Sequence, residues 1–172
     1  MKKFICFFIF LSIFHYIFSQ NDDYLKLYNE IYNQNIFCSP VDGVVVFNDN
    51  YHYGFGYKLS INDDEIYFSD SSIILGNENQ DIYSICDGEI IHIEILYSSC
   101  VFLVIKNNDY EIEYIGINID EKLKIGDNVE KGQLLGKLYF LVGRHLILRI
   151  KYKNYYFDPY LLLPGIKIKV YE

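Results

Sequence analysis

The sequence lacks several features that would place it in a common class of protein. Its 23 acidic residues outnumber its 15 lysines and arginines, for a formal net charge of −8. The shortage of positive charge argues against nucleic acid or anionic lipid as the principal partner. Beyond the first twenty residues, no apolar run is long enough to cross a bilayer. The four cysteines also lack the paired, close spacing of a structural zinc site.

The N-terminus has the layout of a secretory signal peptide. Residues 1–20 read MKKFICFFIFLSIFHYIFSQ, in which two lysines precede an apolar run. We predict a signal peptide over residues 1–19, cleaved near Ser19, and a secreted or periplasmic, cell-envelope location. The alternative is a retained anchor, so a membrane contact is expected only through an uncleaved segment. Removal of Lys2 and Lys3 leaves 13 basic and 23 acidic residues, a net charge of −10.

Three cysteines lie beyond the predicted cleavage site: Cys38, Cys86 and Cys100. An odd number in an exported chain permits at most one intramolecular disulfide and leaves at least one thiol free. The pairing among the three stays open.

The remaining chain has the length of one domain behind a short leader. Residues 22–34 repeat apolar side chains at helical intervals after a capping aspartate, which predicts one short helix in a leader over residues 20–35. From residue 36 to 172 the pattern changes to short runs rich in Ile, Val, Tyr and Phe, broken by Asn-Asp or Asp-Gly. This pattern predicts an all-β domain with antiparallel strands closing into a sandwich or barrel-like core. The predicted strand runs are GVVVF, EIYFS, GEIIHIEIL, VFLVIK, YEIEYIGI, QLLGKLYF, HLILRIKY and YYFDPYLLL.

Residues 53–90, YGFGYKLSINDDEIYFSDSSIILGNENQDIYSICDGEI, resemble a known family of enzymes. They are similar to the core of the LytM/lysostaphin-type zinc metalloendopeptidases, peptidase family M23, which cut peptide cross-links in bacterial cell walls. The likeness continues through EYIGIN at 113–118, KIGDNVEKGQLLG at 124–136 and RHLILRI at 144–150, and it covers about residues 40–164. It implies a LytM-like core of duplicated hairpins, of the barrel-sandwich type. The similarity between the segments SPVDGVVV and SICDGEII is compatible with such a duplication.

The resemblance carries the family's framework without its metal ligands. Position by position, the three zinc ligands of the family fall on Ser69, Ile73 and Ile147, and its two other catalytic histidines fall on Gly116 and His145. Only His145 keeps the family's residue. The resemblance therefore predicts a groove whose floor is lined by Ser69, Tyr114, Gly116 and His145, with no intact catalytic or metal set.

Chemistry decides what these replacements imply. A catalytic zinc ion needs about three carboxylate, imidazole or thiolate donors and an open position for a water molecule. Isoleucine has no lone pair, and a neutral serine hydroxyl is a poor donor. We therefore expect no cofactor. A shifted alignment would place Asn77 and Asp81 at ligand spacing, but Ile147 stays apolar in either register.

Three functions are weighed. The first is an exported, non-catalytic homologue that binds peptidoglycan or regulates an envelope hydrolase. The second is an active cell-wall metalloendopeptidase with a rearranged, zinc-binding site around His145. The third rests on GDNVEKGQLLGKL, which also resembles the hairpins of biotinyl and lipoyl carrier domains, but the chain lacks their Met-Lys-Met or Asp-Lys-Ala motif. The lost ligands favour the first.

Overall fold

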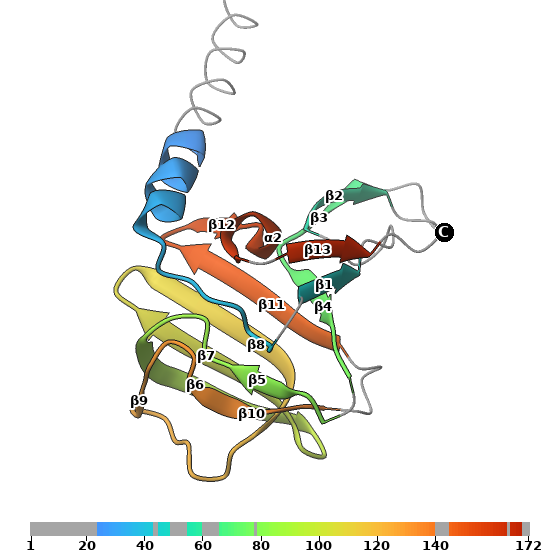
Figure 1. Ribbon diagram of the computed structural model, residues 1–172, viewed down its shortest axis with the longest axis vertical. Coiled ribbons are helices and arrows are strands. Elements are labelled where there is room, and N and C mark those ends of the chain that lie inside the picture. Colours follow the sequence, from blue (N-terminus) through green and yellow to red (C-terminus); the bar gives the residue numbers. More distant parts are fainter. Residues whose placement is uncertain are drawn as a thin grey trace, which may run out of the picture. The chain divides into compact units, whose positions relative to one another are not determined.

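The computed structural model describes residues 24–42, 45–48, 55–59, 66–77, 79–139, 145–164 and 166–169. The chain divides into two compact units, residues 1–35 and 36–172. In the first unit, residues 24–34 are helical, so the described part of the predicted leading helix is confirmed (Figure 1). The predicted signal peptide and the capping aspartate lie outside the described residues. Within the described part of the chain, no helix has both the length and the apolar character needed to span a membrane.

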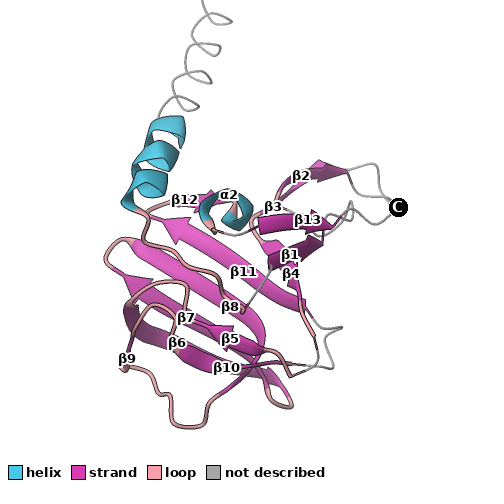
Figure 2. Cartoon of the chain, viewed as in Figure 1, coloured by secondary structure: helices cyan, strands magenta, loops and turns pink. Residues whose placement is uncertain are grey.

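The second unit is built on one large β-sheet and a separate two-stranded hairpin (Figure 2). Along the large sheet the strands follow the order β13-β1-β4-β11-β8-β7-β6-β9, while β10 joins β8 to β5 and β12 pairs with β11; β2 and β3 form the hairpin. The strands are β1 (Val45–Asn48), β2 (Gly56–Leu59), β3 (Ile66–Ser69), β4 (Ser72–Leu75), β5 (Asp81–Tyr83), β6 (Gly88–Tyr97), β7 (Cys100–Asn107), β8 (Tyr110–Ile119), β9 (Asn128–Val129), β10 (Leu134–Leu138), β11 (His145–Tyr152), β12 (Tyr155–Phe157) and β13 (Ile166–Lys169).

The pairing is mostly antiparallel, which confirms the predicted fold class. Among the described strands the exception is β1, which pairs in parallel with β13 at the edge of the sheet. The longest ladders join β6 to β7, β7 to β8 and β8 to β11, and they form the continuous body of the sheet in Figure 1. Their sequences are the long alternating or continuous apolar runs from which the strands were predicted.

Alternation along β11 and along β8 as far as Ile115 separates the two faces of this sheet. In β11, Leu146, Leu148 and Ile150 are fully buried, whereas the residues between them are half-buried. In β8, Ile112 and Tyr114 are likewise fully buried. Because successive side chains on a strand point to opposite faces, one face forms the hydrophobic core. The other face carries His145 and Ile147, two of the positions that the resemblance assigns to the family's site.

The segment YYFDPYLLL is not a single strand as predicted. The strand β12 ends at Phe157, and a one-turn helix, α2 (Pro159–Leu162), follows. The Asp158 carboxylate caps this turn by accepting a hydrogen bond from the Tyr160 N–H. Proline favours the first position of a helix, where its missing N–H is not needed. The Asp-Pro pair therefore overrides the strand preference of the aromatic residues before it.

Candidate functional site

Two of the family's ligand positions meet directly in the sheet. Ile73 on β4 is the cross-strand partner of Ile147 on β11. Directly opposed residues of an antiparallel pair share a face and lie with their Cβ atoms about 5 Å apart. Both side chains are half-buried. The structure thus brings these positions together, as the resemblance requires, but the groups that meet are hydrocarbon.

The same register extends the hydrocarbon surface across two more strands. Ile147 is opposite Ile115 on β8, and Ile115 is opposite Phe102 on β7. Both added side chains are half-buried. We call Ile73, Ile147, Ile115 and Phe102 the apolar row. It crosses β4, β11, β8 and β7 on the face that looks away from the core.

The third ligand position, Ser69, is the last residue of β3. Its hydroxyl donates a hydrogen bond to the backbone carbonyl oxygen of Ser71, 3.3 Å away. The residue is half-buried and pairs with Gly56 on β2. Its proton is therefore used locally, in the turn that leads from β3 to β4. A neutral hydroxyl in such a turn is a weak ligand for zinc compared with imidazole.

Gly116, which stands where the family has a catalytic histidine, leaves no room for a side chain. Its φ is +99°, a backbone conformation that residues with a Cβ atom rarely adopt. A Cβ atom placed there would lie 2.5 Å from the backbone oxygen of His145. The Gly116 carbonyl also accepts a hydrogen bond of 2.8 Å from the Tyr139 N–H. The backbones of β8 and β11 therefore approach closely at the point where a catalytic side chain would stand.

His145, the family residue that persists, begins β11 and is half-buried. It pairs with Leu75 on β4 and lies two residues before Ile147, hence on the same face. That His145 lines a groove stays a prediction.

Tyr114 does not line an open groove but belongs to the core. Its side chain is fully buried, and its hydroxyl oxygen accepts a hydrogen bond of 2.8 Å from the Ile85 N–H. Burial raises its pKa well above the ordinary value for tyrosine. The physical reason is strand parity: an even-numbered residue of β8 points to the opposite face from Ile115. Tyr114 is corrected from a groove residue to a structural one.

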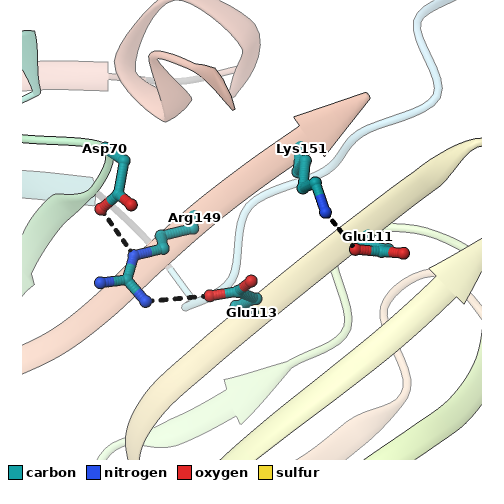
Figure 3. A network of polar contacts seen from close by, with 5 residues as sticks. All are labelled: Asp70, Glu111, Glu113, Arg149 and Lys151. Atoms are coloured by element: carbon teal, nitrogen blue, oxygen red, sulfur yellow. Dashed lines mark hydrogen bonds and ion pairs between the residues drawn. The ribbon is translucent and has the colours of Figure 1, made fainter. Parts of the chain in front are cut away.

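An ion-pair network, which the sequence analysis missed, borders the apolar row (Figure 3). The Arg149 side chain bridges two carboxylates: its Nε donates to Asp70 at 2.8 Å and its Nη1 donates to Glu113 at 3.0 Å. One step further along the same strands, the Lys151 ammonium donates to Glu111 at 3.0 Å. Arg149 is opposite Glu113 in the register and Lys151 is opposite Glu111. On the outer face, these charged residues therefore follow Ile147 along β11.

Arg149 is held firmly in its charged form. Burial acts to lower the pKa of its guanidinium, but the hydrogen bonds and charges of Glu113 and Asp70 outweigh burial and raise the pKa overall. The side chain is 29% exposed and that of Glu113 is 14% exposed. Because arginine stays protonated in proteins, its single positive charge is permanently shared between the two carboxylates. Two acids that lie near the family's metal position are thus already bound to a cation.

The residues present do not fit a catalytic zinc ion. In the part of the chain that the structure describes, no group of three or more His, Cys, Asp or Glu side chains is placed to hold a metal. The shifted alignment does not help, because the Asp81 carboxylate accepts a hydrogen bond of 2.8 Å from the Lys137 ammonium on the β5–β10 pair. Asn77 is exposed and follows β4.

The three cysteines are free thiols rather than a disulfide pair. Cys86 and Cys100 are buried, and Cys38 is half-buried. The Cys38 thiol donates to the Ser84 carbonyl at 3.3 Å. Burial, with the nearby Asp87 charge, raises the pKa of Cys86 to about 12, so this thiol is a poor nucleophile and a poor metal ligand near neutral pH.

Comparison with solved structures identifies the fold. The sequence matches no protein-family model and no curated protein. The structure is similar to Csd3 of Helicobacter pylori, with a TM-score of 0.61, 17% identity, and coverage of 80% of this chain and 37% of that one. It is similar to a chain of the SpoIIQ–SpoIIIAH pore-forming complex, with a TM-score of 0.55, 14% identity, and coverage of 74% and 90%. It is also similar to lysostaphin, with a TM-score of 0.50, 21% identity, and coverage of 66% and 48%.

The chain therefore has the fold of the LytM/lysostaphin-type M23 peptidases, and the resemblance predicted from its sequence is confirmed at the level of the fold. It spans 37% of the length of Csd3 and 48% of the length of lysostaphin. The described residues combine this peptidase fold with an outer face of isoleucines and paired charges.

Proposed function

We propose that the protein is an exported, non-catalytic homologue of the peptidoglycan metalloendopeptidases, acting as a cell-wall binding module or as a regulator of an envelope hydrolase. One observation carries the proposal. Ile73 and Ile147, at two of the family's ligand positions, face each other across β4 and β11. A water molecule at this place has no metal to lower its pKa, and hydrolysis loses its nucleophile.

Binding is favoured over a purely structural role by the composition of the same face. Four apolar side chains in register, bordered by ion pairs, offer hydrocarbon contact beside fixed hydrogen-bonding groups. Recognition sites combine an apolar surface with a few placed polar groups in this way. The solved chain from the SpoIIQ–SpoIIIAH complex, of similar fold, is found in an assembly with another protein. This likeness supports a role in which the fold serves association.

Metal content tests the first half of the proposal. After dialysis, the full chain is expected to hold no stoichiometric zinc in elemental analysis. The triple variant Ser69→His, Ile73→Asp, Ile147→His restores the family's donor types at the three positions and is expected to retain zinc. Stoichiometric zinc in the unaltered protein, together with release of cross-linked peptides from cell walls, would overturn the proposal in favour of a metalloendopeptidase with a rearranged site.

Sedimentation with purified cell-wall sacculi, and in parallel with an immobilised envelope amidase or endopeptidase, tests the second half. The unaltered protein is expected to bind one of these two. The variant Ile115→Asp places a charge in the middle of the apolar row and is expected to reduce that binding at least about tenfold, since burying an unpaired carboxylate is costly. Ile125→Asp is the matched control, because Ile125 lies in an exposed turn outside the row. Equal loss in both variants, or binding to neither target, contradicts a binding face at the row.

A further inference from the structure

Among the described residues, the strand β6 is paired along one edge and largely unpaired along the other. It pairs with β7 along its length. On its other edge, among the described residues, β9 pairs with it at Gly88 and Glu89 only. Ile90 is occupied by hydrogen bonds with Gly126 and Asp127. From residue 91 to 97, no strand in the described part of the chain covers this edge, and its outward backbone groups are available for pairing.

The open edge also carries exposed hydrocarbon. Ile95 is 68% exposed, Tyr97 is 49% exposed, Leu96 is 42% exposed and Ile91 is 38% exposed. The strand sequence, GEIIHIEILY, contains no lysine, arginine or proline. Those are the residues with which soluble proteins normally block the pairing of an edge strand with another chain. Glu94 is the one charged residue among residues 91–97, and the irregularities of the strand lie at the two ends of this stretch, so its middle is suited to accept a further strand.

Two copies of this edge sequence can pair in antiparallel orientation with complementary side chains opposite each other. In an antiparallel pair centred on Ile93, Ile93 is opposite its own copy, and Ile91 is opposite Ile95. His92 is then opposite Glu94, twice, by the symmetry of the pair. An imidazole N–H of His92 can donate a hydrogen bond to the Glu94 carboxylate opposite it, which favours the register, whereas like charges that face each other disfavour it. Centring the pair on Glu94 would place two carboxylates face to face.

The regular part of β6 covers all but one residue, Ile91, of the stretch that the pairing needs. Register shifts between Ile90 and His92, and between Ile95 and Tyr97, bound a regular stretch of β6 over residues 92–95. The partner of Ile91 in the symmetric pair is Ile95, so the pairing needs residues 91–95 and stops short of the end that β9 occupies. Within one chain, His92 and Glu94 already approach to 3.4 Å, which shows that both side chains lie on one face.

We propose that residues 91–95 of β6 pair with the same residues of a second copy of this chain, antiparallel and centred on Ile93. The two sheets then continue into one another across a two-fold axis. His92 and Glu94 lie on the face of Phe102, because Glu94 is opposite Phe102 and the His92 ring is 5.3 Å from the Phe102 ring. The dimer therefore joins the apolar rows of both copies on one surface.

Cysteine cross-linking of the full chain in cells tests the register. At the two-fold centre the two Cα atoms of residue 93 lie about 5 Å apart, within the range of a disulfide. Under mild oxidation, Ile93→Cys is expected to give a covalent dimer on a non-reducing gel. Ile95→Cys alone is expected to give only the background of the unaltered chain, because the two residues 95 lie about 13 Å apart along the strands. Co-expressed Ile91→Cys and Ile95→Cys chains are expected to cross-link to each other.

A second substitution tests whether the covalent dimer arises from strand pairing or from random collisions between chains. Adding Ile95→Lys to Ile93→Cys places a lysine on the open edge, where its exposure makes it compatible with the fold, and is expected to lower the dimer band several-fold. Leu161→Lys, at a comparably exposed position on α2, is the matched control and is expected to leave the band unchanged. No dimer with Ile93→Cys, or equal bands for residues 93 and 95, overturns the proposal.

Discussion

On the β8–β11 pair, one face consists of buried hydrocarbon, whereas the other mixes half-buried isoleucines with ion pairs. Leu146, Leu148 and Ile150 are built into the core, and the residues between them form the surface where a peptidase would place its site. The core face meets only the demand of close packing. The outer face is hydrocarbon where the family has ligands and charge-paired beyond them. The hydrocarbon core of this pair of strands is thus built from residues other than those at the family's ligand positions.

The largest effect is expected from the core face. Leu148→Ala removes a fully buried side chain and should lower the free energy of unfolding by about 2–5 kcal/mol. The neighbouring Ile147→Ala is half-buried and should cost less than about 2 kcal/mol. Denaturant titration of the two variants measures the difference. Equal losses would mean that both faces are packed alike and that the outer face is covered in solution.

The next effect concerns the close approach of β8 and β11. Gly116→Ala should lower the free energy of unfolding by about 2–3 kcal/mol, because its φ of +99° and the contact with the His145 oxygen both oppose a Cβ atom. Gly126 provides the control: its φ is +93°, but no atom lies within 4 Å of a Cβ placed there. Gly126→Ala should therefore cost about 1 kcal/mol. A Gly116 variant no worse than the control in the same titration would show that the strands separate freely.

The smallest of the three effects concerns the charged part of the outer face. Arg149→Met leaves the Asp70 and Glu113 carboxylates without their shared cation and should lower stability by about 1–2 kcal/mol, with a loss that shrinks as salt increases. Lys151→Met removes a single partner and should cost about 0.5 kcal/mol.

The pH dependence of this last pair of variants sharpens the test. The hydrogen bond to Glu111 raises the pKa of Lys151, so its contribution to stability is complete below the ordinary lysine pKa and is lost as the pH rises through the raised value. Arg149 keeps its charge throughout this range. The stability difference between the unaltered protein and Lys151→Met should therefore vanish at alkaline pH, while the difference for Arg149→Met persists. If both stability differences declined together as the pH rises, the two ion pairs would not differ in the way described.

Much of this fold is predictable because its longest strands alternate. The alternating sequences HLILRIKY and YEIEYIGI predict strands with one apolar and one polar face. The residue-by-residue resemblance placed Ile73 and Ile147 at one site, and the register shows that they are cross-strand partners. The parallel pairing of β1 with β13 was beyond such reasoning, because it joins segments from opposite ends of the domain. The one-turn helix was missed because a capped Asp-Pro turn outweighs local strand preference.

The positions of Ile73 and Ile147 were predictable from the resemblance, whereas the ion pairs between neighbouring strands were not. Parity would have placed Tyr114 in the core, because its neighbours Glu113 and Ile115 both lie on the outer face of β8 and successive side chains point to opposite faces. The same parity puts Arg149 and Lys151 on one face of β11, and Glu111 and Glu113 on one face of β8. Their meeting depends on the register between strands far apart in the chain, which no local pattern encodes. Asp70, at the turn after β3, was equally hidden.

The tight crossing of the backbones at Gly116 sets how easily lost chemistry can return. Replacing Ile73 or Ile147 with an acid or an imidazole exchanges one side chain for another on an existing surface. No codon change at position 116 can do the same, because the carbonyl of His145 fills the space into which any new residue must grow. Substitution alone could therefore introduce a metal-binding pair at positions 73 and 147, whereas a histidine at position 116 would require the two strands to move apart.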